Sequence, residues 1–80
     1  PNMSTDTLTR LQQLAVQRFG DKAAHINPDA DFFEALGIGS LQALDLLTDL
    51  EDAFDVEVPD YELQGVNTFQ ALANVIEQRL

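Results

Sequence analysis

Residues 34–54 read EALGIGSLQALDLLTDLEDAF, and the rest of the chain is organised around this segment. Gly37 and Gly39 disfavour a helix that runs through them, because glycine loses more backbone freedom in a helix interior than any other residue. The residues that follow have apolar side chains at helical spacing, so we predict a helix that begins at or just after Gly39. Ser40 then lies in its first turn, exposed where a loop meets a helix.

The predicted helix has two faces. At about 100° per residue, its apolar side chains gather on one side and form a buried stripe of Ala43, Leu46, Leu47, Leu50 and Phe54. The opposite side carries an acidic row at the i, i+4, i+7 spacing, made of Asp45, Asp49 and Asp52.

Two leucines lie outside the buried stripe. Leu41 shares the acidic side with Thr48 and points away from the core, while Leu44 lies at the margin of the stripe. Single exposed leucines are ordinary, and capping is the common role of a serine at a helix start, so each feature alone has a purely structural explanation. An exposed serine, a neighbouring leucine and an acidic row together are harder to explain by structure alone.

Charge is distributed very unevenly. The net charge is −10, from 14 acidic and 4 basic residues. Residues 23–78 contain no lysine or arginine, whereas 12 of the 14 acids lie there. Such a surface repels nucleic acid and anionic lipid and attracts cationic protein surfaces. We therefore expect basic protein partners, no nucleic acid, no membrane, and a monomer.

Length and composition exclude other classes. The 80 residues are enough for one domain, 1–80, and the absence of cysteine excludes disulfides and thiolate metal sites. No apolar run reaches the length of a membrane span and no signal segment opens the chain, so we expect a cytoplasmic protein. Pro1 and Asn2, ahead of Met3, are typical of an added remnant before a natural start, which favours a free-standing protein.

The remaining segments predict an all-α fold. Helical spacing recurs over residues 5–19, with Ser4, Thr5 or Asp6 as a cap, and over 67–79, where Asn67 and Gln70 resemble a capping box. Residues 59–63 suit one short helix, and a turn capped by Asp31 precedes Gly37. Residues 21–30 have no clear period. The result is a small bundle of three main helices plus one short helix before the last. We expect Tyr61 to be a buried ring with a solvated hydroxyl, or else to line a cleft.

No catalytic or metal site is predicted. A nucleophilic serine needs a base within reach, and His25, the only histidine, lies in a distant loop. The segment 29–31 begins like a calcium loop but has Phe33 where an oxygen ligand is required. The carboxylates lie on an open helix face and stay solvated. We therefore interpret the protein as a substrate of enzymes.

The segment LGIGSL, residues 36–41, followed by an acidic helix, resembles the prosthetic-group attachment site of the acyl carrier protein family, whose usual form is Leu-Gly-x-Asp-Ser-Leu. Residues 32–34, 56–60 and 67–72 are similar to the family at corresponding spacing. One departure is Gly39, which stands where most members have aspartate and is similar to peptidyl carriers and some divergent acyl carriers.

The resemblance implies a non-catalytic, discrete carrier. A 4′-phosphopantetheine arm from coenzyme A would be attached to Ser40 by a phosphopantetheinyl transferase, and its thiol would carry fatty acyl or polyketide intermediates as thioesters between synthase enzymes. On this interpretation Leu41 and Leu44 would be apolar anchors beside the arm. Four acids would steer basic patches on the transferase, the loading enzymes and the synthase enzymes: Asp45, Asp49, Glu51 and Asp52. Thr48 would belong to the same partner surface. Three alternatives stay open: a peptidyl or aminoacyl carrier of a nonribosomal pathway, an unmodified acidic interaction module, and a small acidic binding protein unrelated to thioesters, for which calcium is one ligand to test.

Overall fold

The protein is all-helical, as its sequence predicts. The structure is a computed structural model that describes residues 3–80, with side chains from Asp6 onward. Pro1 and Asn2, the expected remnant, lie outside the described residues. In chain order the α-helices and the 3₁₀ helices (η) are α1 (Met3–Phe19), η1 (Asp21–His25), α2 (Phe32–Leu36), α3 (Ser40–Phe54), η2 (Asp60–Leu63) and α4 (Phe69–Glu77). Three main helices and the short η2 before the last confirm the predicted architecture.

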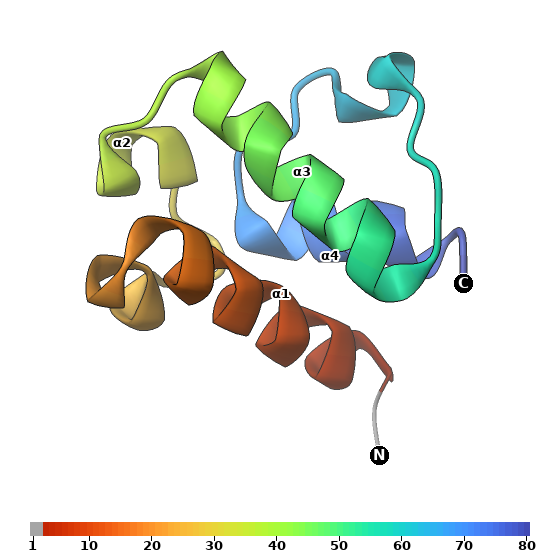
Figure 1. Cartoon of the computed structure of the whole chain (residues 1–80), viewed down its shortest axis with the longest axis horizontal. Helices are drawn as coiled ribbons and strands as arrows, with labels where there is room; N and C mark the ends of the chain where they lie inside the picture. The colour runs from red at the N-terminus through yellow and green to blue at the C-terminus, as the bar shows by residue number, and fades with distance from the viewer. Residues whose placement is uncertain (1–2) are drawn as a thin grey trace.

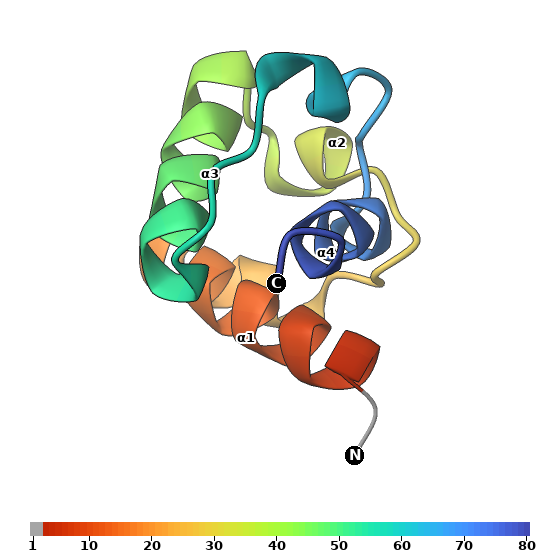
Figure 2. The same ribbon diagram turned by 90° about the vertical axis from the view of Figure 1, so that its right-hand side faces the viewer.

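The helices surround α4. Figure 1 shows α1 and α3 on one side of the molecule, with α4 behind them. Figure 2 looks along α4 and shows α1, α2 and α3 around it, with η2 above. The largest fully buried side chains come from α1, α3 and α4: Phe69, Leu11, Leu46, Leu50 and Ile76. The core is therefore shared by all three main helices, and burial of this apolar surface is the main force that holds them together.

The short helix α2 positions the start of α3. The Asp31 carboxylate caps it by accepting hydrogen bonds from the backbone N–H groups of Phe33 (2.9 Å) and Glu34 (3.3 Å), as predicted. Gly37 ends α2 in the left-handed conformation, with φ of 65°, which glycine adopts without a steric penalty. The Phe32 and Phe69 rings are stacked with their centroids 5.4 Å apart, and this contact packs α2 against α4.

Two predictions of helix caps are wrong. Helix α1 begins at Met3, so Ser4, Thr5 and Asp6 lie within the helix and not at its cap. At the start of α4 the cap is Thr68, whose hydroxyl accepts a hydrogen bond from the Ala71 N–H (3.1 Å). Asn67 instead donates to Asp31 at 3.4 Å. Tertiary contacts thus decide which of two adjacent polar residues caps the helix.

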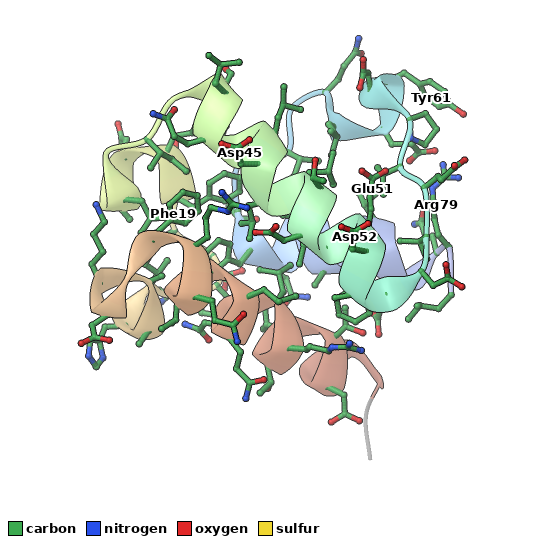
Figure 3. The ribbon with its side chains drawn as sticks, viewed as in Figure 1. Phe19, Asp45, Glu51, Asp52, Tyr61 and Arg79 are labelled. Carbon is green, nitrogen blue, oxygen red and sulfur yellow. The ribbon has the colours of Figure 1, made fainter. Side chains whose placement is uncertain are left out.

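Two further differences concern short segments. The structure forms η1 in the part of the chain predicted as an irregular connection. The sequence did not predict it, because a five-residue 3₁₀ helix is too short to produce an apolar period. Tyr61 was expected to be buried or to line a cleft, but it is 68% exposed, and it is absent from the lining of the cleft that its neighbours Asp60 and Leu63 help to form. In Figure 3 its ring points away from the bundle.

Candidate functional site

Ser40 occupies the first helical position of α3, as predicted. The preceding residue, Gly39, is the N-cap, with φ of −103° and ψ of −175°. Its N–H is bonded to the side-chain oxygen of Gln42 at 3.1 Å. The Ser40 side chain is exposed, and among the described residues its hydroxyl makes no hydrogen bond. Capping therefore does not explain this serine, and its oxygen is free to react.

The helix start favours an anion beside Ser40. The first hydrogen bond at this end of α3 runs from the Ala43 N–H to the Gly39 carbonyl at 3.1 Å. The amides of residues 40–42 thus precede the first helical bond, and Gly39 offers no side chain to accept from them. Free N–H groups and the helix dipole give this end a partial positive charge. A phosphodiester on the Ser40 oxygen fits that environment.

An apolar cleft opens next to Ser40. It has a volume of about 340 Å³ and lies between α2, α3, η2 and the first turns of α4. Its polar lining is limited to Ser40, Asp60 and Gln64. The other lining residues are apolar: Phe32, Phe33, Ala43, Leu44, Leu47, Leu63, Val66 and Leu72. A chain attached at the Ser40 hydroxyl thus begins at the edge of a cavity suited to hydrocarbon.

The outer surface of α3 carries exposed leucines and acids. Leu41 is 77% exposed and Leu44 is 46% exposed, as the helical projection predicts. Asp45 and Asp52 are exposed as well, and Figure 3 shows both on the outward side of the helix. Neither carboxylate forms an ion pair with a described side chain. Thr48 is exposed, but its hydroxyl donates to the Leu44 carbonyl at 3.1 Å.

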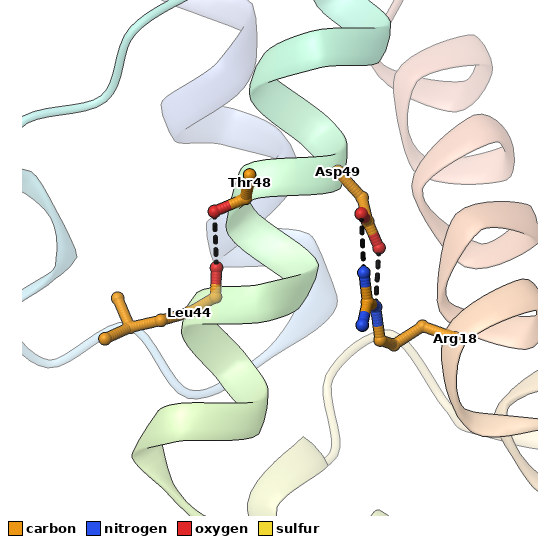
Figure 4. A network of polar contacts seen from close by, with 4 residues as sticks. All are labelled: Arg18, Leu44, Thr48 and Asp49. Atoms are coloured by element: carbon orange, nitrogen blue, oxygen red, sulfur yellow. Dashed lines mark hydrogen bonds and ion pairs between the residues drawn. The ribbon is translucent and has the colours of Figure 1, made fainter.

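The other two acids of the predicted partner surface are bonded within the fold. Asp49 accepts two hydrogen bonds of 2.8 Å from Arg18 on α1 (Figure 4). The Glu51 carboxylate accepts a 2.8 Å hydrogen bond from the N–H of Val58, a residue that is only 7% exposed. The structure thus separates carboxylates that the sequence groups together: Asp45 and Asp52 face solvent, whereas Asp49 and Glu51 also hold the fold.

The Arg18–Asp49 pair changes the acidity of both groups. The hydrogen bonds from Arg18, reinforced by its charge, lower the pKa of the Asp49 carboxyl against the opposing effect of burial. The same hydrogen bonds, then the charge of Asp49 and finally that of Asp45, raise the pKa of the Arg18 guanidinium. Arg18 therefore remains a cation within the field of two aspartates.

Sequence reasoning missed the arginines of α1. Arg18 binds Asp49, and Arg10 donates to the Ala53 carbonyl at 2.8 Å while its guanidinium lies 4.7 Å from the centre of the Phe54 ring. Arg10 thus places a cation near the C-terminal end of α3, which complements the dipole of that helix. The eight-residue spacing of the two arginines places them on similar sides of α1, and that signal was available in the sequence.

Outside this region the described residues offer little for chemistry. His25 is exposed at the end of η1. From Asp6 onward, no three histidine, aspartate or glutamate side chains gather as a metal site would require. No helix of residues 3–80 is long and apolar enough to cross a bilayer.

Ser40, the start of α3 and the apolar cleft thus lie together, at the position that the sequence predicts for an attached group. A family model described as "Phosphopantetheine attachment site" matches residues 9–76. The match covers most of the chain, so this protein belongs to that family of carrier domains. Its members carry covalently attached 4′-phosphopantetheine, are modified by phosphopantetheinyl transferases, interact with synthase enzymes and are not themselves catalysts.

Proposed function

We propose that residues 1–80 form an acyl carrier domain in which Ser40 holds 4′-phosphopantetheine and the loaded cargo is a fatty acyl or polyketide chain. When attached, the arm supplies a thiol that binds the cargo as a thioester. The observation that supports this function best is the free Ser40 hydroxyl at the edge of an apolar cleft. A growing hydrocarbon chain gains about 25 cal/mol for each Å² that it removes from water, and the cleft offers that burial.

Each residue of the site has a distinct role in this proposal. The Ser40 oxygen forms the phosphodiester bond, and the amides at the start of α3 stabilise the negative charge next to it. Leu41 and Leu44 offer apolar contacts to a partner, while Asp45 and Asp52 attract its basic side chains. These contacts are few, which suits a carrier that must leave each enzyme quickly. The charge of −10 favours a monomer.

Loading with coenzyme A and a broad-specificity phosphopantetheinyl transferase tests the attachment site. We expect a mass increase of one phosphopantetheine on the wild-type chain. The chain has two serines, Ser4 and Ser40, which gives a matched pair of variants. Ser4→Ala should load normally and Ser40→Ala should not load. A wild-type chain of unchanged mass would favour the unmodified interaction module instead.

The class of cargo is tested separately. A medium-length acyl chain on the arm should raise the Tm of the loaded protein, because it fills the cleft, whereas an aminoacyl group should not. Ala43 and Ala53 are both half-buried on α3, but only Ala43 lines this cleft. Ala43→Leu should therefore reduce the acyl-dependent rise in Tm, and Ala53→Leu should leave it unchanged.

A peptidyl carrier is the second candidate, because Gly39 takes the place of the usual aspartate. It would be supported by an acyl chain that leaves the Tm unchanged, together with efficient loading by an enzyme that activates amino acids. The same result would show that the cleft does not hold the cargo.

A further inference from the structure

All four basic side chains of this acidic protein make hydrogen bonds or ion pairs with other residues of the same chain. Arg10 donates to the carbonyl of Ala53, and the Lys22 ammonium donates to the carbonyl of Leu36 at 2.9 Å. The other two form ion pairs of 2.8 Å, Arg18 with Asp49 and Arg79 with Glu62. The ion pair of Arg18 differs from the other three contacts, because it lies within the surface that the proposed function assigns to partners.

The pair lies in the middle of the acidic row. Asp49 is one turn beyond Asp45 and precedes Asp52 by three residues, so it occupies the central position of the three. Arg18 Nε bonds one carboxylate oxygen of Asp49 and Nη2 bonds the other, both at 2.8 Å (Figure 4). A bidentate contact of this kind uses both oxygens of the carboxylate and is strong for a surface interaction. Asp45 and Asp52 are left as the accessible ends of the row.

A partner can nevertheless reach the pair. The side chains of Arg18 and Asp49 are 40% and 29% exposed. They line an open groove of about 550 Å³ between α1 and α3, together with Leu14, Gln17, Asp52 and Ala53. A cationic side chain that enters this groove must compete with Arg18 for Asp49, and it is also repelled by the Arg18 charge.

We propose that Arg18 is a specificity-determining residue of the partner surface, which holds Asp49 within the fold and so restricts basic partners to Asp45 and Asp52. The inference rests on the proposed carrier function. It predicts that Arg18 weakens the binding of basic partners, the transferase included, because it withholds Asp49 from their cations and leaves only Asp45 and Asp52 accessible.

The affinity of the apo chain for a broad-specificity phosphopantetheinyl transferase tests this role. Ser40→Ala serves as the background, so that binding is measured without reaction. Arg18→Gln removes the charge and frees Asp49, and we expect tighter binding by up to about fivefold at low ionic strength, the equivalent of one exposed charge pair. The gain should shrink at physiological ionic strength, since the contact is screened. Unchanged or weaker binding of Arg18→Gln would overturn the proposal.

A matched control separates this effect from net charge. Arg79→Gln makes the same change of charge and frees Glu62 from an ion pair of equal length outside the acidic row of α3. It should leave the affinity within about twofold of the parent, and an equal gain from both variants would reduce the role of Arg18 to net charge. Adding Asp49→Asn to Arg18→Gln should remove the gain.

A parallel experiment tests the carrier function itself: the wild-type chain is loaded, and its mass increase is measured. Failure to load would overturn both proposals. Normal loading without a gain from Arg18→Gln would overturn only the role of Arg18.

Discussion

The two halves of α3 differ in the contacts that their polar side chains make. In the first half, residues 40–47, Ser40 and Asp45 face solvent without a side-chain partner among the described residues, beside exposed Leu41. In the second half, residues 48–54, Asp49 is bonded to Arg18 and Glu51 to the backbone of Val58. The buried stripe continues through both halves. Asp49 and Glu51 thus fasten the second half of α3 to the rest of the fold, whereas Asp52 in that half faces solvent, as Ser40 and Asp45 do in the first half.

This division has a physical reason. Side chains that bind partners must stay solvated in the free protein, so they contribute little to the free energy of folding. The second half supplies what the first half lacks: polar contacts to α1 and to the loop of residues 55–59, in addition to burial. Stability and recognition can therefore be changed separately, and substitutions in each half test the comparison.

The largest effect is expected from the buried stripe. Leu50 is 0% exposed, and Leu50→Ala should lower the free energy of unfolding by about 2 to 5 kcal/mol, because it loses buried apolar surface and leaves a cavity. Leu41→Ala, at 77% exposure, should change it by less than about 0.5 kcal/mol. Denaturant unfolding of the two apo variants measures the difference. Similar losses from both would mean that Leu41 is packed in solution.

A smaller loss is expected where a loop is fastened to the second half of α3. Glu51→Ala leaves the Val58 N–H without its acceptor and should cost about 1 to 3 kcal/mol. The adjacent Asp52 is exposed, so Asp52→Ala should change the free energy of unfolding by less than about 0.5 kcal/mol. It should weaken the binding of a basic partner. The two variants lose the same charge. Equal stability in denaturant unfolding would show that the bond to Val58 contributes nothing.

The sequence predicts what depends on local pattern. The start of α3 at Ser40, its buried leucines, the exposure of Leu41 and the capping of α2 by Asp31 all follow from helical period, glycine positions and short-range hydrogen bonding. These features involve residues within one or two turns of each other. They need no knowledge of how the helices pack.

The features that could not be predicted depend on contacts between distant segments. Asp45, Asp49 and Asp52 are equivalent in a helical projection, and only the position of Arg18, 31 residues before Asp49, distinguishes them. Glu51 differs from Asp52 because the loop after α3 brings the N–H of Val58 within hydrogen-bond distance of the Glu51 carboxylate. Tyr61 was misplaced because the side toward which η2 turns its ring is set by packing against the rest of the bundle.

The pair of Arg18 and Asp49 should make the contribution of the second half of α3 to stability depend on pH. Because Arg18 lowers the folded-state pKa of Asp49, the carboxylate stabilises the fold above its ordinary pKa, and this contribution is lost as the pH falls through the lowered value. The difference in Tm between wild type and Arg18→Gln should therefore be constant near neutral pH and shrink below about pH 4. Thermal unfolding at a series of pH values measures it. The difference in Tm between the two proteins cancels the charge repulsion that they share. A difference that grows as the pH falls would contradict a lowered pKa of Asp49.

The smallest effect is expected at the first residue before α3. Gly39 has an extended backbone that any residue adopts, so Gly39→Asp should not strain the chain. A Cβ there would lie 3.3 Å from the Gln42 side-chain oxygen, which must shift slightly. The new carboxylate can accept from the amides of the first turn, and an aspartate cap exceeds glycine by only a few tenths of a kcal/mol.

The Tm of the apo Gly39→Asp variant should accordingly rise slightly or stay the same, with normal loading at Ser40. After loading, the carboxylate and the phosphodiester would compete for the same amides, so the gain of the apo form should disappear in the modified protein. A gain that persists in both forms would mean that the amides at the start of α3 do not hold the phosphate, and that the first half of the helix contributes only an exposed hydroxyl.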